Sequence, residues 1–596
     1  MPAILSDNRI HDIINLSRRA FGRYRWQIVT LTALGFMGGL LEGIGINAVI
    51  PLFSFIIGGE QGDDFISQAI RRIFEYAHVD FNLTFLLLFI VLMFILKAAT
   101  MATFVYIKIK INVDYAERTR DELFRTTLAS SWGHLLNQKL GHLEMILMND
   151  VTRGAHMLQL ISSFIMITTG LTMYVVVALN ISVSITLLTL ALGGVFFLLF
   201  KPLMYRTRMA AYQTAVMNKD VNHYVSENVL GAKTVKSMFA GSAVAQKGSE
   251  YFSRLKELNR TVFMLSNISS ILVQPVSLIF ICIVFVVSYQ SPDFSFAVLV
   301  AIVYLIQQMF QYIQQIQGNL HATNEAVPYL KSVLEHQENS LRAAEIDSGH
   351  ARFSFERSLD FKNISFAYVK GLEVLKNVSF SIHRGEMVGL IGRSGGGKTT
   401  IVDLLLRLFN PISGAIMLDG RDFTEISVGE WRKNVGYVSQ DIFLMNDTIA
   451  NNIRFYNNGL TDKDIETAAK MANIYDFIQT CPDGFETVIG ERGVMLSAGQ
   501  RQRIIIARVL ARNPKILILD EATSALDNES EAKIQKVIEN LKRKITVLAV
   551  AHRLSTIKNA DRLLVLENGK ITETGTPEEL LSDKQSYFYR LYNIRQ

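Results

Sequence analysis

The sequence predicts two domains of different fold class, an all-α membrane domain of six helices followed by an α/β domain. Six apolar stretches fall in the first 320 residues. Each is long enough to cross a hydrocarbon core of about 30 Å, which needs roughly 20 residues. Further along, Met387–Ile391 and Lys515–Leu519 are short apolar runs typical of strands buried on both faces of a parallel sheet. A chain of 596 residues is also long enough for more than one domain.

A glycine-rich stretch follows the first of these runs. Gly392–Thr399 (GRSGGGKT) matches the pattern G-x-x-x-x-G-K-[ST] between a predicted strand and a predicted helix, the context that a P-loop requires. Backbone N–H groups of such a loop face nucleotide phosphates, Lys398 would reach the β- and γ-phosphates, and the Thr399 hydroxyl would hold Mg²⁺. The predicted nucleotide-binding residues here are Gly392, Ser394, Gly395, Gly396, Gly397, Lys398, Thr399 and Thr400.

Two acidic residues follow the second apolar run. Asp520 and Glu521 lie at the carboxyl end of this predicted strand, where open α/β sheets bind their ligands. Upstream, Ser497 begins a helical pattern, and a helix N-terminus with small residues offers free N–H donors to a phosphate. Taken alone, the same residues also fit a capped surface helix in front of a core strand.

The order of these motifs resembles the ATPase domain of an ABC transporter. Tyr368, GRSGGGKTT, Gln440, ERG before LSAGQ, LILDE, SALD and His552 carry the resemblance, which covers roughly residues 355–596. The predicted fold class is therefore a six-helix permease domain followed by an α/β P-loop ABC ATPase domain. One departure is Ala498, which replaces a glycine of the usual LSGGQ signature and removes backbone freedom there.

The resemblance implies a role for each matching residue. Tyr368 would stack on the adenine of ATP, and Asp520 would orient Mg²⁺. Glu521 would act as general base or position the attacking water, Gln440 would sense that water, and His552 would contact the γ-phosphate. Outside the family, Tyr368 fits a strand-edge aromatic and His552 a structural histidine. The implied metal ligands are Thr399, Gln440 and Asp520. The residues implied to contact either ATP or the ATPase domain of a second copy are Ser497, Gly499, Gln500 and Asp527.

Charge placement predicts how the chain crosses the membrane. Lys and Arg gather before the first span, between the second and third, and between the fourth and fifth, so both termini are expected in the cytoplasm of a bacterium, under its inner membrane. No cleavable signal peptide is expected. The spans are predicted at 27–57, 82–111, 157–180, 182–204, 263–289 and 294–317. The predicted parts are a cytoplasmic segment (1–25), the six-span domain (26–320), a linker (321–352) and the ATPase (353–596).

The arrangement resembles an exporter-type half-transporter, with the permease first and the ATPase second. The resemblance implies coupling helices within 132–148 and near 223–236, although plain amphipathic helices fit the same residues. It also implies a second copy, because ATP lies between the P-loop of one ATPase and the signature of the other. Two identical copies are expected, since Glu521 and His552 are both present; a heterodimer with a degenerate partner is the alternative.

Three features bear on the substrate. Glu42 and Lys97 lie within predicted spans, where an ionisable residue indicates a functional site. A buried ion pair between the two, or a Lys97 side chain that reaches the membrane interface, fits the same residues. Gln307, Gln311 and Gln314 share one helical face, which suits a polar cavity wall or interhelical contacts. Residues 63–77 predict an amphipathic helix on the external membrane surface. Its apolar residues are Phe65, Ile66, Ala69, Ile70, Ile73 and Phe74.

That external helix and the segment LLEGIGINAVIP together resemble the bacterial lipid-linked oligosaccharide flippases over about fifty residues. The expected substrate is therefore an amphipathic lipid or a lipid-linked saccharide, and a multidrug or lipid exporter of broad specificity is the alternative. A soluble ATPase acting on nucleic acid is contradicted by the spans, and no arginine-rich tail supports nucleic-acid binding at a formal net charge of +6. A channel or signalling role is a further alternative. The two cysteines, Cys282 and Cys481, give no disulfide framework.

Overall fold

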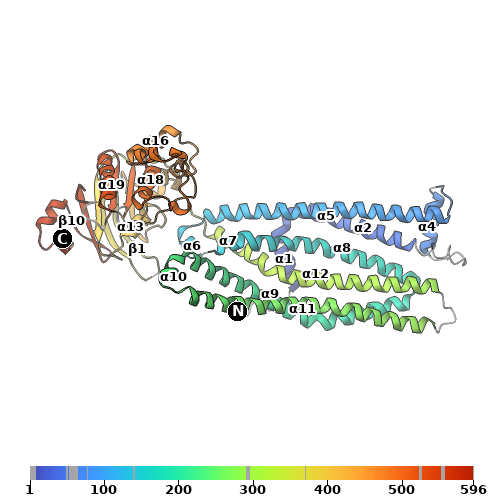
Figure 1. Ribbon diagram of the computed structural model, residues 1–596. Coiled ribbons are helices and arrows are strands. Elements are labelled where there is room, and N and C mark those ends of the chain that lie inside the picture. Colours follow the sequence, from blue (N-terminus) through green and yellow to red (C-terminus); the bar gives the residue numbers. More distant parts are fainter. Residues whose placement is uncertain are drawn as a thin grey trace. The chain divides into compact units, whose positions relative to one another are not determined.

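The computed structural model of the protein consists of two compact units (Figure 1). The helical unit comprises Met1–Ser130 and His134–Ala344, and the α/β unit comprises Ser131–Gly133 and Glu345–Gln596. The structure describes residues 9–48, 52, 65–76, 78–138, 141–289, 296–369, 371–521, 527–551 and 557–594. The fold class predicted from the sequence is confirmed.

Long helices make up the helical unit, and Figure 1 shows α5, α8, α9, α11 and α12 running alongside one another. With 46 residues, α5 is about 70 Å long, more than twice the thickness of a hydrocarbon core. Apolar spans therefore continue into polar helix without a break. The helices are α1 (Arg9–Phe21), α2 (Arg25–Asn47), α4 (Phe65–Tyr76), α5 (Leu83–Leu128), α6 (Trp132–Leu136), α7 (His142–Met145), α8 (Val151–Ile181), α9 (Val183–Leu230), α10 (Ala232–Ser237), α11 (Gly241–Tyr289) and α12 (Phe296–Arg342).

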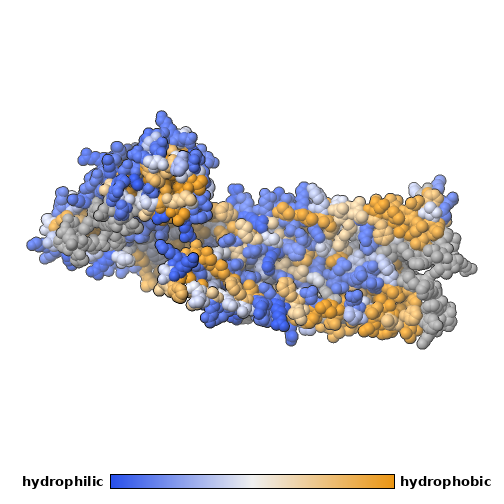
Figure 2. All heavy atoms as spheres, viewed as in Figure 1, coloured by the Kyte–Doolittle hydropathy of each residue, from blue (hydrophilic) through white to orange (hydrophobic). Residues whose placement is uncertain are grey.

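Four described helices are long and apolar enough to cross a membrane, and a shorter apolar stretch begins α9. The sixth predicted span, 294–317, coincides with the first part of α12, where glutamines interrupt the apolar side chains. Figure 2 shows apolar side chains gathered over the part of the unit toward α4. The four stretches are Ile13–Gly45, Leu83–Leu128, His142–Leu179 and Gly241–Val286, and the shorter one is Val183–Val195.

The segment predicted as a linker, 321–352, is helical as far as Arg342, because α12 extends well beyond its apolar part. Its polar half is held within the helical unit by side-chain contacts. Arg153 of α8 donates to the Tyr329 hydroxyl at 2.6 Å, and Thr127 of α5 lies 3.0 Å from His336. Glu345 begins the α/β unit, where it pairs with Arg432.

The segment between α5 and α8 contains the first predicted coupling region. Its beginning, Ser131–Gly133, clusters with the α/β unit, and a Cβ on Gly133 would lie 3.3 Å from the Phe409 ring. Further on, Gly141 has a φ of +73°, and a Cβ there would approach the Ser226 hydroxyl to 2.7 Å. Only glycine fits this turn without strain. Asp150 is 2% exposed and lies within the helical unit.

Helix α4 lies at the end of the helical unit where α5 begins (Figure 1), and part of its apolar face is buried there. Ile70 and Phe74 are 2% and 5% exposed, in a cluster with Ala48 and Leu86. The Phe74 ring lies 5.3 Å from that of Phe81 and 5.5 Å from that of Phe89. The predicted residues Phe65, Ile66, Ala69 and Ile73 have side chains outside the described ones. The described apolar side chains of α4 thus contact the beginning of α5.

Two sheets form the α/β unit. A six-stranded sheet has the order β10-β9-β3-β8-β7-β6, in which β9, β3, β8, β7 and β6 are parallel. A four-stranded sheet has the order β2-β1-β4-β5. The strands are β1 (Ser358–Phe366), β2 (Leu375–His383), β3 (Met387–Gly392), β4 (Ser413–Leu418), β5 (Arg421–Asp422), β6 (Val435–Val438), β7 (Ile516–Asp520), β8 (Thr546–Val550), β9 (Arg562–Glu567) and β10 (Lys570–Gly575).

Every residue of β3, β7 and β8 is buried, as their uninterrupted apolar runs predict for a sheet covered on both faces. The covering helices bury side chains in two large clusters. They are α13 (Lys398–Leu405), α14 (Val428–Asn434), α15 (Ile449–Arg454), α16 (Asp462–Met471), α17 (Tyr475–Thr480), α18 (Ala498–Leu510), α19 (Asn528–Leu541), α21 (Pro577–Ser582) and α22 (Tyr587–Ile594). Because β3, β7 and β6 are parallel, their carboxyl ends meet at one edge of the sheet.

Candidate active site

The P-loop joins β3 to α13 at this edge. Gly392 has a φ of +153°, and a Cβ there would lie 2.1 Å from the Leu566 carbonyl oxygen, so no larger residue fits. Gly395 and Gly397 also have positive φ, at +78° and +103°. Glycine reaches these conformations without a steric penalty, which turns the loop around the start of α13. The backbone amides that follow are those a phosphate group binds.

Lys398 is the first residue of α13 and is 6% exposed. Its Nζ donates to the carbonyl oxygens of Gly392 and Arg393, each at 3.0 Å. Burial lowers the pKa of Lys398, and the neighbouring carboxylates of Glu521 and Asp520 oppose that shift. The ammonium group is therefore held inside the loop, at the position a phosphate-binding lysine occupies.

Asp520 ends β7 beside the P-loop and is 5% exposed. Burial raises the pKa of its carboxyl group, while a hydrogen bond from the Tyr437 hydroxyl to Oδ2, at 3.3 Å, acts in the opposite direction. A buried carboxylate and the exposed hydroxyl of Thr399, the residue after Lys398, are oxygen donors of the kind that Mg²⁺ prefers. A bound cation would also stabilise the charged form of Asp520. These residues fit the predicted metal site.

Glu521 follows the strand in the left-handed backbone region, with a φ of +49°. Its amide donates to the Val550 carbonyl oxygen at 3.0 Å. Its carboxylate accepts a hydrogen bond from Gln440 Nε2 at 2.8 Å. A non-glycine residue in this conformation is uncommon, and such residues concentrate at functional sites. The structure thus brings together the predicted base and the predicted water sensor, which lie 81 residues apart in the sequence.

Tyr368 contacts the P-loop helix α13 through its hydroxyl. Its hydroxyl donates to Asp403 Oδ2 at 2.8 Å and lies 3.2 Å from the Thr400 hydroxyl. Burial raises its pKa to about 12, and the ring meets those of Phe366 and Phe409 edge to face. The side chain is still 47% exposed. Adenine stacking on this ring stays a prediction.

The signature forms the start of α18. Ser497 accepts from the amide of Gln500 at 3.3 Å, and the Gln500 side chain accepts from the Ser497 amide at 2.8 Å, a reciprocal capping box. Ala498 is helical and packs against the core, so this position needs no glycine conformation. At Gly499, by contrast, a Cβ would lie 2.3 Å from the Ser530 hydroxyl. Asp527 caps the neighbouring α19 by accepting from the Ser530 amide at 3.4 Å.

Two sets of predicted residues cannot be placed. His552 and most of the SALD motif, including Ser524, lie outside the described residues. Ser394, Gly396 and Thr400 lie within the P-loop and the first turn of α13 as predicted.

Sequence reasoning missed Tyr437 and Arg508. Tyr437 lies on β6, three residues before Gln440, and its hydroxyl bonds to the carboxylate of Asp520 on the neighbouring strand β7. Arg508 of α18 is 8% exposed and donates to the carbonyl oxygens of Asn452 and Phe443 at 2.7 and 2.8 Å, which anchors the segment after Gln440. Burial lowers its pKa to about 10. Parallel strand order could have suggested Tyr437, whereas no local pattern indicates Arg508.

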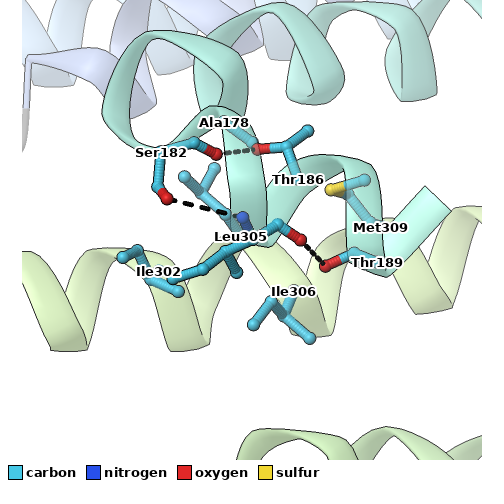
Figure 3. A pocket seen from close by; sticks show the side chains of 9 residues that line it. Ala178, Ser182, Thr186, Thr189, Ile302, Leu305, Ile306 and Met309 are labelled. Atoms are coloured by element: carbon cyan, nitrogen blue, oxygen red, sulfur yellow. Dashed lines mark hydrogen bonds between the residues drawn. The ribbon is translucent and has the colours of Figure 1, made fainter. Parts of the chain in front are cut away.

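In the helical unit, Glu42 and Lys97 form the ion pair that the sequence offered as one alternative, at 2.8 Å. Gln307 and Gln311 are exposed on α12. Figure 3 shows a cavity between α8, α9 and α12, where the hydroxyls of Thr186 and Thr189 donate to the backbone carbonyls of Ser182 and Ile185. Its volume is about 10 Å³, room for at most one water molecule. This cavity is too small for a lipid headgroup.

Comparison with known proteins identifies the family. Residues 375–524 match the family model described as ABC transporter. The heterocyst differentiation ATP-binding protein HepA of a Nostoc species is 31% identical over 485 residues, 79% of this chain and 78% of that protein. An ATP-dependent lipid A-core flippase of Syntrophus aciditrophicus is 47% identical over 237 residues. A protein of Staphylococcus aureus named as a multidrug export ATP-binding/permease protein is 47% identical over 238 residues.

The last two matches cover 40% of this chain and only 39% and 41% of those relatives. A solved structure of a bacterial Atm1-family ABC exporter with ATP bound superimposes with a TM-score of 0.76 over 96% of this chain and 98% of that one. Its sequence identity of 23% makes this a likeness of fold. Together, the motif geometry, the family match and the relative aligned over most of both chains show that this chain belongs to the ABC transporter family, with a helical membrane unit of the exporter fold followed by an ATPase unit.

Proposed function

We propose that two copies of this chain form an ATP-driven exporter or flippase. It would move an amphipathic lipid or lipid-linked saccharide outward from the cytoplasmic side of a bacterial inner membrane. One observation carries the proposal: the same chain contains an ATPase site and a unit of long apolar helices. In that site, a buried P-loop lysine lies near the hydrogen-bonded pair of Glu521 and Gln440. Both termini and the ATPase unit would lie in the cytoplasm, as the distribution of Lys and Arg indicates.

The catalytic roles follow from the geometry. Lys398, with its ammonium group inside the P-loop, would bind the β- and γ-phosphates. Glu521 would accept a proton from the attacking water or position it, and Gln440 would hold the Glu521 carboxylate in place. Thr399, Gln440 and Asp520 would hold Mg²⁺, which neutralises charge on the phosphate oxygens when bound. His552 would contact the γ-phosphate, and Tyr368 the adenine.

Movement would pass to the helical unit through the segment before α8. The family resemblance implies that the predicted coupling helix within 132–148 docks on the ATPase unit. The second predicted region contains α10, next to Met238 and Phe239, which are 74% and 93% exposed. Exposed apolar side chains in a polar part of a protein favour an interaction site. ATP binding would shift the two copies toward an outward-open conformation, and hydrolysis would reset them.

A dimer is proposed because the signature and the P-loop are complementary halves of one site. A mixed dimer of a Lys398→Ala copy and a Ser497→Arg copy tests this arrangement. If ATP lies between the two copies, one site keeps both an intact P-loop and an intact signature. We expect the mixed dimer, isolated through two different tags, to hydrolyse ATP at about half the parent's rate, because one of two sites is complete. Dimers of either single variant are the controls and should be inactive.

If the mixed dimer is as inactive as its controls, ATP is not shared between copies in this way. A requirement for a different ABC chain, the heterodimer alternative, would appear as no activity in the purified parent protein.

The substrate class rests on α4 and on the relatives' names. The flippase and multidrug names of two relatives suit a lipid or another amphipathic molecule. A multidrug or lipid exporter of broad specificity is the second candidate. Mass spectrometry of lipids that co-purify with the parent protein separates the two. A single enriched lipid-linked saccharide supports the first proposal, and a spread of ordinary membrane lipids supports the second.

Removing the buried side chains of α4 gives a further prediction. Ile70 and Phe74 each contribute about 1.5–3 kcal/mol when fully buried, so Ile70→Ser with Phe74→Ser should detach α4 from α5. We expect lipid movement in proteoliposomes to fall while basal ATP hydrolysis stays within about twofold of the parent, since the ATPase core does not include these residues. The matched control is Arg72→Ser with Glu75→Ser, on the exposed face of α4. Unchanged lipid movement would remove α4 from substrate handling.

A further inference from the structure

Glu42 accepts hydrogen bonds from three other helices of the helical unit. Lys97 of α5 donates to Oε1 at 2.8 Å, and the Tyr174 hydroxyl of α8 donates to the same oxygen at 3.0 Å. The Tyr312 hydroxyl of α12 donates to Oε2 at 3.1 Å. The side chain of Glu42 is 17% exposed and that of Lys97 25%. One carboxylate therefore ties α2 to α5, α8 and α12 within predicted membrane spans.

Small residues bring these helices close enough for the contact. Gly35, Gly39 and Gly43 lie four residues apart on one face of α2, and a Cβ on each would lie 3.0–3.5 Å from side chains of α8. At Gly170 of α8, a Cβ would lie 2.6 Å from the Tyr312 ring. Glycine there leaves the room through which Tyr312 reaches Glu42. The close backbone approach and the polar contacts thus belong to one interface, called the seam here, with α2 on one side and α8 and α12 on the other.

The partners of Glu42 differ in charge, and this difference matters if the seam opens. Lys97 balances the charge of Glu42 from α5, which packs along α2. Tyr174 and Tyr312 are neutral donors on the other side of the seam. Separating α2 and α5 together from α8 and α12 would break the two phenol bonds but keep the ion pair, so no isolated charge would be exposed to lipid. The hydrogen bonds from Tyr174 and Tyr312 have a charged acceptor, so each is stronger than a bond between neutral groups. Both bonds are non-covalent and can form again when the helices come back together.

We infer that Glu42, Tyr174 and Tyr312 form a reversible latch that holds this seam closed and releases when the transporter opens outward. Glu42 lies five residues before the end of α2 that leads to α4, on the side proposed to be external. Outward opening would separate the helices at that end. The inference rests on the transport cycle proposed above and adds the residues whose contacts that cycle must break.

A disulfide across the seam measures whether it is closed. A Cβ on Gly35 would lie 3.5 Å from the Met166 Cβ, a separation that suits a disulfide. Gly35→Cys with Met166→Cys is placed in the full chain with Cys282→Ala and Cys481→Ala, reconstituted in lipid. We expect oxidation to cross-link the nucleotide-free protein and a non-hydrolysable ATP analogue to suppress the cross-link. Adding Tyr174→Phe and Tyr312→Phe removes only the two hydroxyls.

The analogue concentration that halves the cross-link should then fall about fivefold or more, because less binding energy is needed to open a seam that has lost two hydrogen bonds to a charged acceptor. Tyr106→Phe, an exposed phenol on α5, is the matched control and should leave this concentration unchanged. Tyr312→Phe alone should shift it in the same direction, and serves if the double variant folds poorly.

If the analogue concentration that halves the cross-link is unchanged in the phenylalanine variants, the latch is overturned. This holds even if the melting temperature of the variants falls, because a lower melting temperature alone indicates static packing. A cross-link that the analogue never suppresses in the parent would overturn it too. Neither result touches the proposed function, which fails separately if the parent protein moves no lipid on addition of ATP.

Discussion

Glu521→Gln is expected to lower ATP hydrolysis on the order of 10²-fold or more while ATP binding persists. The amide has the shape of the carboxylate but cannot accept a proton. The backbone N–H of Glu521 donates a hydrogen bond to the Val550 carbonyl oxygen, and Gln440 Nε2 donates to the side-chain carboxylate at 2.8 Å. The substitution therefore removes the basic group without disturbing the P-loop, and the protein should accumulate as an ATP-bound dimer.

The measurement is steady-state ATP hydrolysis by the purified variant, with nucleotide binding assayed in parallel. Glu529→Gln is a matched control, because that carboxylate is largely exposed on α19, where it pairs with Lys533. Near-parent hydrolysis by the Glu521 variant would exclude Glu521 as the base.

Lys398→Ala should instead weaken ATP binding itself. Its ammonium group is buried inside the P-loop, where it bonds to two loop carbonyl oxygens. In the complex, the same group would meet phosphate oxygens. Hydrogen bonds to charged groups contribute about 1.5–3 kcal/mol, so the Kd for ATP should rise roughly 10- to 100-fold. The variant also loses hydrolysis, but as a consequence of lost binding.

Equilibrium binding of ATP to the purified protein checks this expectation. Lys362→Ala is the control, since Lys362 is exposed on β1 and takes no part in the site. An unchanged ATP affinity in the Lys398 variant would contradict the assignment of the phosphate cradle.

The ATP site could be predicted from the sequence because its geometry is local. A strand, a glycine loop and a helix follow one another in the chain, so the pattern at Gly392–Thr399 fixes where Lys398 lies relative to the loop. Asp520 ends a buried parallel strand and Glu521 follows it, and carboxyl ends of parallel strands share one edge. The contact between Gln440 and Glu521 needed the family resemblance, because nothing local joins β6 to β7.

The contacts between helices could not be predicted. Apolar periodicity identifies a span but not its neighbours, so the sequence suggested the Glu42–Lys97 pair without showing that Tyr174 and Tyr312 complete it. The helical continuation into the segment predicted as a linker could not be predicted either, since a polar composition after residue 320 does not stop a helix. Arg508 was missed because its partners, Asn452 and Phe443, come from a loop whose path only the fold determines.

Movement of lipid across a sealed membrane tests the central claim most directly. Proteoliposomes would contain the parent protein and the lipid that co-purifies with it, with the ATPase unit facing outward. Addition of ATP and Mg²⁺ should then move that lipid from the outer to the inner leaflet, and Glu521→Gln should abolish the movement. ATP hydrolysis at the parent rate with no ATP-dependent movement of that lipid would contradict the account.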